Sequence, residues 1–357
     1  MLANVKKSGY KQPTPIQKFA MPLISRGKDL MACSQTGSGK TAAFLLPMMA
    51  RLMKENNLSN AGESTCSPRV LIIAPTRELA QQIYKEAYKF SSGTIFSVEI
   101  VYGGTSVVHQ LSRISRGATI LVGTTGRLKH FVREGRINLS EVKYVVLDEA
   151  DRMLDMGFKE DIDEIFNNPD MKPKEERQTL MFRQTMRKVM TSETVPGATF
   201  PEMVQEMAHK LLNNDFTMVV VGEIGSANTC ITQEFIECER SEKKVHLMRL
   251  LDIDLKKYEL KEGSDLKQKK TLVFVSQKKM ADVIGAHVCE AGIKCTTIHG
   301  DREQRQREEA IRDFKNGSTP ILVATAVAER GLDITGVDHV INYDLPNDIN
   351  EYVHRIG

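Results

Sequence analysis

The chain has 357 residues, more than one hydrophobic core usually serves, so its length favours two domains. Hydrophobic residues make up 41% and charged residues 27%, a profile typical of a globular protein and unlike that of a disordered or fibrous chain. The net charge of +3 is weak, so composition alone neither requires nor excludes a nucleic-acid partner.

Cysteine spacing and apolar run lengths exclude other classes. None of the six cysteines pairs with another at the CxxC spacing of a zinc knuckle or redox site, and free thiols suggest a reducing compartment. No apolar run approaches the ~18 residues of a membrane span. The residues after Met1 lack the apolar region of a secretory signal. We therefore expect a cytosolic or nuclear protein with no membrane partner.

Short apolar runs, each followed by a segment of helical character, recur along the chain. They lie at 29–32, 71–74, 144–147, 272–275 and 321–324, with a last run at 339–343. This alternation predicts βαβ units, and hence an α/β fold with parallel sheets. In such sheets ligands bind at the carboxyl ends of the strands, so the residues after each run are candidates for chemistry.

A polar stretch with glycine, serine and asparagine, 222–232, interrupts this pattern. It predicts a first domain over 1–221, a linker over 222–232 and a second domain over 233–357. Segments 56–68 and 252–270 have the composition of surface loops.

The segment after the first apolar run is rich in glycine and precedes a helical pattern. Such a loop turns backbone N–H groups toward phosphate oxygens, and the helix after it adds its positive dipole end. Lys40 can reach the β- and γ-phosphates and Thr41 can hold Mg²⁺. Ser34 stands where the simplest pattern has glycine, so a chance glycine-rich turn is the alternative. The phosphate-binding candidates are Gly37, Ser38, Gly39, Lys40 and Thr41.

Two acidic residues, Asp148 and Glu149, follow the run 144–147. A carboxylate at a strand end can hold Mg²⁺, usually through water, and its neighbour can orient or deprotonate an attacking water. An acidic helix start is the alternative. Combined with the upstream loop, the pair favours nucleotide hydrolysis, with Lys40, Asp148 and Glu149 catalytic and with Thr41 and Asp148 as metal ligands.

The acidic pair is also part of the tetrapeptide Asp-Glu-Ala-Asp, and other motifs surround it. They lie at residues 9–17, 75–80, 103–104, 124–127, 299–302, 304–307, 324–325, 330–333 and 354–357. Their identity and order over nearly the whole chain resemble the DEAD-box family of ATP-dependent RNA helicases. Local wording, such as Val-Tyr-Gly-Gly-Thr-Ser at 101–106, looks most like the Vasa branch, and the related Belle branch shares much of it.

The resemblance implies two tandem RecA-like domains, each a parallel sheet flanked by helices. It implies that Gln17 of the Q motif contacts the adenine edge through its amide, favouring ATP over GTP. Gly331 and Asp333 would contact ATP from the second domain. ATP binding would then close the domains as a clamp that bends bound RNA. A monomer is expected, located in the cytoplasm and, if Vasa-like, in perinuclear germ granules.

The implied RNA-binding residues are mostly small, hydroxyl-bearing or arginine side chains. These suit sugar and phosphate contacts that do not read base sequence and that weaken with salt. They are Thr76, Arg77, Gly104, Thr124, Arg127, Arg302 and Thr325.

Three departures from the family pattern bear on activity. Residues 183–197 interrupt the expected Ser-Ala-Thr motif, and Thr125 stands where the family has proline. The chain as written ends at Gly357, before two arginines that the resemblance leads us to expect; such arginines are worth about 10³–10⁵ in rate. We therefore expect slow ATP hydrolysis, and the alternative function is an RNA- and ATP-binding protein impaired in catalysis.

Overall fold

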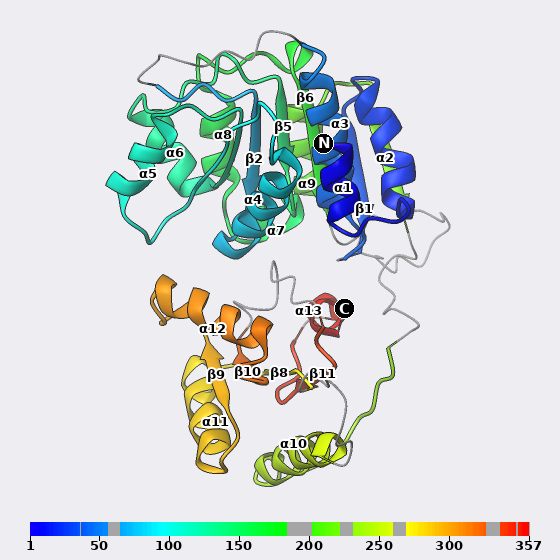
Figure 1. The fold of residues 1–357 in the computed structure, drawn as a ribbon, viewed down its shortest axis with the longest axis vertical. Coiled ribbons are helices and arrows are strands. Elements are labelled where there is room, and N and C mark those ends of the chain that lie inside the picture. Colours follow the sequence, from blue (N-terminus) through cyan, green and yellow to red (C-terminus); the bar gives the residue numbers. More distant parts are fainter. Residues whose placement is uncertain are drawn as a thin grey trace. The chain divides into compact units, whose positions relative to one another are not determined.

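The computed structural model describes residues 1–35, 37–55, 65–183, 202–221, 231–259, 269–325, 336–347 and 349–356. The chain divides into two compact units, Met1–Gly225 and Ser226–Gly357. Both units are α/β (Figure 1). The predicted domain limits and the linker at 222–232 remain predictions, because residues 222–230 lie outside the described part of the chain.

The first unit contains a seven-stranded sheet in the order β3-β4-β2-β5-β6-β1-β7, and every pairing in it is parallel. Its strands are β1 (Leu30–Ser34), β2 (Val70–Ala74), β3 (Val98–Val101), β4 (Ile120–Thr124), β5 (Tyr144–Leu147), β6 (Gln178–Arg183) and β7 (Thr217–Val221). Its helices are α1 (Leu2–Lys7), α2 (Pro15–Ser25), α3 (Lys40–Leu52), α4 (Arg77–Ser91), α5 (Val107–Ile114), α6 (Thr125–Arg133), α7 (Ala150–Asp155), α8 (Lys159–Phe166), the short η1 (Lys174–Glu176) and α9 (Glu202–Leu211).

Both faces of this sheet are covered, as Figure 1 shows. Successive strand residues point to opposite faces, so each buried strand contributes to two core layers. In β2, Val70 and Ile72 belong to the layer that contains α2, α3 and α4. Leu71 and Ile73 belong to the layer that contains α6, α7, α8 and α9. This two-sided burial explains why the strands are continuous apolar runs in the sequence.

The second unit contains a four-stranded parallel sheet in the order β11-β8-β10-β9. Its strands are β8 (Thr271–Phe274), β9 (Cys295–Ile298), β10 (Ile321–Ala324) and β11 (His339–Asn342). Its helices are α10 (Lys243–Glu259), α11 (Lys278–Glu290), α12 (Gln304–Asn316) and α13 (Ile349–Ile356). Leu247 of α10 and Ile284 of α11 pack on one face of the sheet, and Phe314 of α12 packs on the other.

The predicted fold class of two parallel sheets with helices is confirmed, whereas two predicted loops are wrong in part. Helix α10 continues to Glu259, so the first half of segment 252–270 is helical. Cys66, Ser67 and Pro68 are buried, and Cys66 forms a β-bridge with Ile137.

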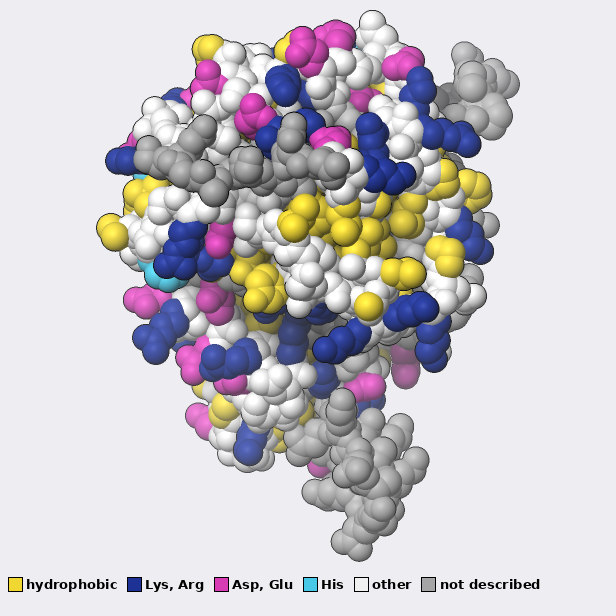
Figure 2. Space-filling model, turned by 45° about the horizontal axis from the view of Figure 1, so that its top comes forward, with side chains coloured by type: hydrophobic (Ala, Val, Ile, Leu, Met, Phe, Trp, Pro, Cys, Tyr) yellow, Lys and Arg dark blue, Asp and Glu magenta, His cyan; other side chains and the backbone are white. Residues whose placement is uncertain are grey.

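Within the described ranges, the helices are too short or too polar to cross a bilayer. Lys and Arg intermingle with Asp and Glu on the face drawn in Figure 2, in keeping with the net charge of +3.

Candidate functional site

Apart from Gln17, the candidates of the first unit share one edge of its sheet. The phosphate-binding candidates follow β1, and the acidic pair follows β5. The predicted RNA-binding residues follow β2 and β3 or lie at the end of β4. Because these strands are parallel, their carboxyl ends lie along the same edge. The topology therefore places motifs that are far apart in the sequence along one rim.

The loop between β1 and α3 is shaped by two glycines. Gly37 and Gly39 have φ of 67° and 88°, in the left-handed region that residues with a side chain rarely adopt. Gly39 is the N-cap of α3, so the helix begins at Lys40. The first N–H groups of a helix have no partner within the helix and form a ready site for a phosphate anion. The loop thus has the backbone geometry that its sequence predicts.

Hydrogen bonds within the loop hold its polar groups together. The Lys40 Nζ donates to the carbonyl oxygens of Ser34 and Gln35, at 2.8 and 3.0 Å. Thr14 Oγ1 donates to the Ser38 carbonyl oxygen at 2.7 Å, and the hydroxyls of Ser34 and Ser38 lie 2.9 Å apart. The Lys40 ammonium therefore lies against the loop backbone, where phosphate oxygens can replace the two carbonyl acceptors.

Gln17, in the first turn of α2, connects that helix to the loop. Its Oε1 accepts from the Thr14 N–H at 3.0 Å, and its Nε2 donates to the Gly39 carbonyl oxygen at 3.1 Å. A Cβ on Gly39 would lie 2.5 Å from Gln17 Nε2, so only glycine allows this approach. The structure places Gln17 beside the phosphate loop; its contact with adenine stays a prediction.

The acidic pair is deeply buried at the end of β5. The pKa of Asp148 is raised to about 7: burial is the main cause and the charge of Glu149 adds to it, whereas Lys40 and the Glu149 N–H act to lower it. Burial also raises the pKa of Glu149, against Arg152 and Lys40, which lower it. Among the described residues, Glu149 is the one non-glycine with a positive φ, 54°. Such backbone strain is typical of functional sites.

The donor set suits Mg²⁺ better than a transition metal. Within the described residues, no group of three or more His, Cys, Asp or Glu side chains could hold a metal. Mg²⁺ beside a nucleotide typically takes one or two carboxylates together with phosphate oxygens and water. Asp148 supplies a buried carboxylate whose ionised form a cation would favour, and Thr41 follows Lys40 in the first turn of α3.

The predicted RNA-binding residues of the first unit gather around two arginines. Thr76 is the N-cap of α4, where its hydroxyl accepts from the Leu79 N–H, and Arg77 begins the helix. The Arg77 guanidinium packs on Gly104, whose Cβ would lie 2.3 Å from Arg77 Nη1. The two arginines also interact electrostatically. Burial is the main cause that lowers the pKa of Arg127, and the positive charge of Arg77 is the second.

Arg127 also has an unused donor. Its Nη1 is buried without a hydrogen-bond partner among the described residues, and its guanidinium lies 5.3 Å from the ring of Phe131. Thr124, the last residue of β4, is the N-cap of α6, and Thr125 is buried as the first residue of that helix. Close cations with an unsatisfied donor are an arrangement that can attract an anion such as a phosphate; the contact with RNA stays a prediction.

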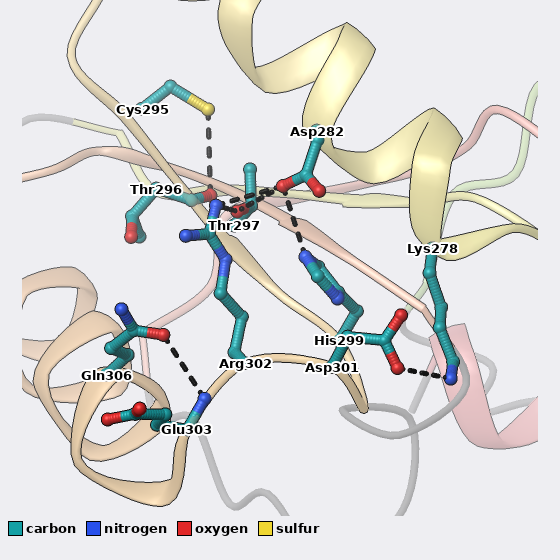
Figure 3. A network of polar contacts seen from close by, with 10 residues as sticks. All are labelled: Lys278, Asp282, Cys295, Thr296, Thr297, His299, Asp301, Arg302, Glu303 and Gln306. Carbon is teal, nitrogen blue, oxygen red and sulfur yellow. Dashed lines mark hydrogen bonds and ion pairs between the residues drawn. The ribbon is translucent and has the colours of Figure 1, made fainter.

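The second unit places Arg302 and Thr325 at the corresponding edge of its own sheet. Thr325 directly follows β10, and its buried Oγ1 has no partner among the described residues. Arg302 lies between β9 and α12, and its Nη2 donates to Asp282 Oδ1 at 2.9 Å and to Thr297 Oγ1 at 2.8 Å. Figure 3 shows these two contacts of Arg302. Sequence reasoning misses Asp282, because nothing in the pattern of α11 distinguishes it from a solvated aspartate.

Several predicted features lie outside the described residues. They are Thr36 of the phosphate loop, nearly all of the interruption at 183–197, the linker residues 222–230, and Gly331 and Asp333. Arg183, the first residue of the interruption, is described and ends β6.

Comparison with known proteins agrees with this geometry. The family DEAD/DEAH box helicase matches residues 14–192, and the helicase conserved C-terminal domain matches residues 246–357. The chain is 53% identical to the ATP-dependent RNA helicase glh-1 of Caenorhabditis elegans, covering 100% of this chain and 45% of that protein. It is 49% identical to a probable ATP-dependent RNA helicase, vasa-like, of Penaeus vannamei, covering 100% and 48%. The chain thus spans about half the length of these relatives.

Solved structures show the same architecture. S. cerevisiae Dbp5 bound to RNA and ADP BeF3 is 27% identical, with a TM-score of 0.77 over 99% of this chain and 82% of that one. Mss116p, at 24% identity, shares the fold with a TM-score of 0.81 over 99% and 68%. The predicted pair of RecA-like domains is therefore confirmed. By its motifs, its fold and the match of its first unit, the chain belongs to the DEAD/DEAH box helicase family.

Proposed function

We propose that this chain is the core of an RNA helicase that uses ATP hydrolysis to bind RNA and to separate short duplexes. The observation that carries the proposal is the position of Lys40, Asp148 and Glu149 on one sheet edge, where the charge of Lys40 lowers the pKa of both acids. Support also comes from the relatives, which are named ATP-dependent RNA helicases, and from Dbp5, whose structure holds RNA and ADP BeF3.

The residues proposed to act on the phosphates and the attacking water each have a distinct task. Lys40 leaves the carbonyl oxygens of Ser34 and Gln35 to neutralise phosphate charge. Thr41 and Asp148 hold Mg²⁺, which supplies further charge neutralisation at the transferring phosphoryl group. Glu149 orients the attacking water and accepts its proton, a task suited to a buried carboxylate with a raised pKa.

The remaining predicted residues serve selectivity and RNA. Gln17 favours ATP through its amide, while its bond to Gly39 connects the adenine side of the site to the phosphate loop. Arg77, Gly104 and Arg127 in the first unit bind the sugar–phosphate backbone without reading sequence. The set is completed by Thr76 and Thr124 in the first unit and by Thr325 and Arg302 in the second unit. We also propose a cytoplasmic location, as the likeness to the Vasa branch implies.

The test is RNA-stimulated phosphate release by this chain and by single variants. Lys40→Ala removes the charge nearest the phosphates, so we expect release to fall by about 10²-fold or more and ATP binding to weaken. Glu149→Gln should keep ATP binding and lose turnover, because it removes the base alone. Lys28→Ala is the matched control: Lys28 lies before the amino end of β1 and forms an exposed ion pair with Asp215.

Release that is insensitive to Lys40→Ala, or that RNA does not stimulate, would contradict the proposal. ATP and RNA binding with negligible release would instead support the catalytically impaired alternative, which the sequence leaves open.

A further inference from the structure

One oxygen of Asp282 is the centre of a polar network on the second unit (Figure 3). Asp282 Oδ1 accepts from Arg302 Nη2 at 2.9 Å and from Thr297 Oγ1 at 3.3 Å. The ring Nε2 of His299 lies 3.1 Å from the same oxygen. Arg302 Nη2 also donates to Thr297 Oγ1 at 2.8 Å. A single carboxylate therefore contacts three side chains that come from or adjoin β9.

A close approach of helix to strand makes this network possible. Asp282 lies on α11, and Gly285 lies one turn later on the same helix. A Cβ on Gly285 would lie 2.4 Å from Thr297 Cγ2 in β9, so only glycine allows the two elements to pack this closely. Glycine is unfavourable inside a helix compared with alanine. Its presence here is explained by the approach that brings Asp282 within reach of β9.

The network leaves one side of the Arg302 guanidinium available. Both of its hydrogen bonds use Nη2, and its Nε is buried without a partner among the described residues. No hydrogen bond within the described chain engages Nη1. Burial raises the pKa of Asp282, but hydrogen bonds from His299 and Arg302 and their charges bring it below the ordinary value. The anchor for Arg302 is therefore ionised at neutral pH.

We propose that Asp282 is a positioning residue for RNA: it holds the Arg302 guanidinium so that Nη1 meets a backbone phosphate. The proposal rests on the proposed function, which assigns Arg302 to RNA. A flexible arginine loses rotamer freedom when it binds a ligand, and a guanidinium anchored in advance avoids part of that loss.

Electrostatics alone predicts the opposite effect. A carboxylate near an RNA path repels phosphate, so its removal should tighten RNA binding at low salt. Under the positioning role its removal weakens binding, because Arg302 loses its anchor. The sign of the change therefore separates the two explanations.

The experiment measures binding of a fluorescent single-stranded oligouridylate by anisotropy, with a non-hydrolysable ATP analogue and fixed salt. Asp282→Ala should weaken binding about three- to tenfold. Asp282→Asn, which keeps an oxygen acceptor, should retain most of the affinity. Thr297→Val keeps the shape that packs on Gly285 and removes the second anchor, so it should weaken binding less than Asp282→Ala does. Glu290→Gln is the matched control, since it removes the same charge from an exposed end of α11.

A double variant tests whether Asp282 acts through Arg302. Asp282→Ala added to Arg302→Ala should cause no further loss of RNA affinity. The thermal midpoint of unfolding of each variant checks that it is folded. Unchanged or tighter RNA binding in Asp282→Ala, with weaker binding in Arg302→Ala, would overturn this inference and leave the proposed function intact. No effect of Arg302→Ala would overturn the inference together with the assignment of Arg302 to RNA. A parent chain that does not bind RNA would overturn the proposed function itself.

Discussion

Gly104 lies where a side chain would be strained and would displace the Arg77 guanidinium that packs on it. Its φ is 76°, and a Cβ there would lie 2.3 Å from Arg77 Nη1. Gly103 differs in both respects: its φ is not in the left-handed region, and a Cβ there would lie an ordinary 3.5 Å from Arg77 Nη2. Adjacent glycines therefore have different importance for the same arginine.

We expect Gly104→Ala to displace Arg77 and to weaken RNA binding by about tenfold or more, the value of a hydrogen bond to a charged group. Gly103→Ala should bind RNA as the parent does, and ATP binding should be unaffected in both variants because neither glycine adjoins the phosphate loop. RNA titrations of the three proteins measure this. Equal losses in the two variants would show that Arg77 is not what Gly104 accommodates.

At the scale of elements, Asp29 joins three segments around the start of β1. Its Oδ1 accepts from the Thr179 N–H in β6 at 2.9 Å, and its Oδ2 accepts from the Asn213 N–H before β7 at 2.7 Å. Burial nevertheless raises its pKa above the ordinary 3.8, outweighing those bonds and the charge of Arg177. A carboxyl group with a raised pKa is protonated more readily in the folded than in the unfolded chain.

The contribution of Asp29 to stability is therefore fully present below pH 3.8 and is lost as pH rises through its higher folded-state pKa. We expect the free energy of unfolding of the first unit to contain a component that falls over this range. Asp29→Asn should lack that component, although it should be less stable overall because an amide accepts through one oxygen only. Urea unfolding at a series of pH values gives both curves; the same pH slope in parent and variant would contradict this assignment.

How much of each element the sequence predicts depends on how deeply it is buried. Strands β2, β5, β8 and β10 are buried along their whole length, so they appear as uninterrupted apolar runs. Strand β9 is mostly half-buried and has no such run, whereas β7 contains the apolar run 218–221 although it is only partly buried. Helix α10 has lysines and acids through its second half, which resemble a loop when read without their neighbours.

At the scale of the whole molecule, the predicted ATP-binding residues are divided unequally between the units. Gln17, Lys40, Thr41 and the acidic pair all belong to the first unit, which has core layers of its own. The second unit is expected to add Gly331 and Asp333. The predicted adenine and phosphate contacts therefore lie almost entirely within Met1–Gly225.

We expect the fragment 1–225 to bind ATP within about tenfold of the whole chain's affinity, because few of the predicted contacts are removed. The same fragment should show no RNA-stimulated hydrolysis, since Arg302 and Thr325 are absent. Isothermal titration and phosphate release measure the two properties, and Lys40→Ala in the fragment is the control for specific binding. A fragment that folds but does not bind ATP would show that the second unit contributes most of the affinity.

The sequence identifies the residues of the candidate site better than it identifies their contacts. Motif order places Lys40, Asp148 and Arg302 at strand ends, because the carboxyl edge of a parallel sheet is where ligands bind. The bond from Gln17 to Gly39 and the network around Asp282 depend on how closely helices approach the loop or strand beside them. Such approaches are tertiary facts that no local pattern encodes.

At Glu149, which has a left-handed backbone conformation, stability and the proposed catalysis favour different residues. That conformation costs a residue with a side chain about 1–2 kcal/mol, and burial adds a second penalty for the carboxylate. Glycine at this position would relieve both penalties but would remove the buried ion pair between Glu149 and Arg152. Where the relief exceeds that loss, selection for thermal stability alone would replace the glutamate, and turnover would be lost with it.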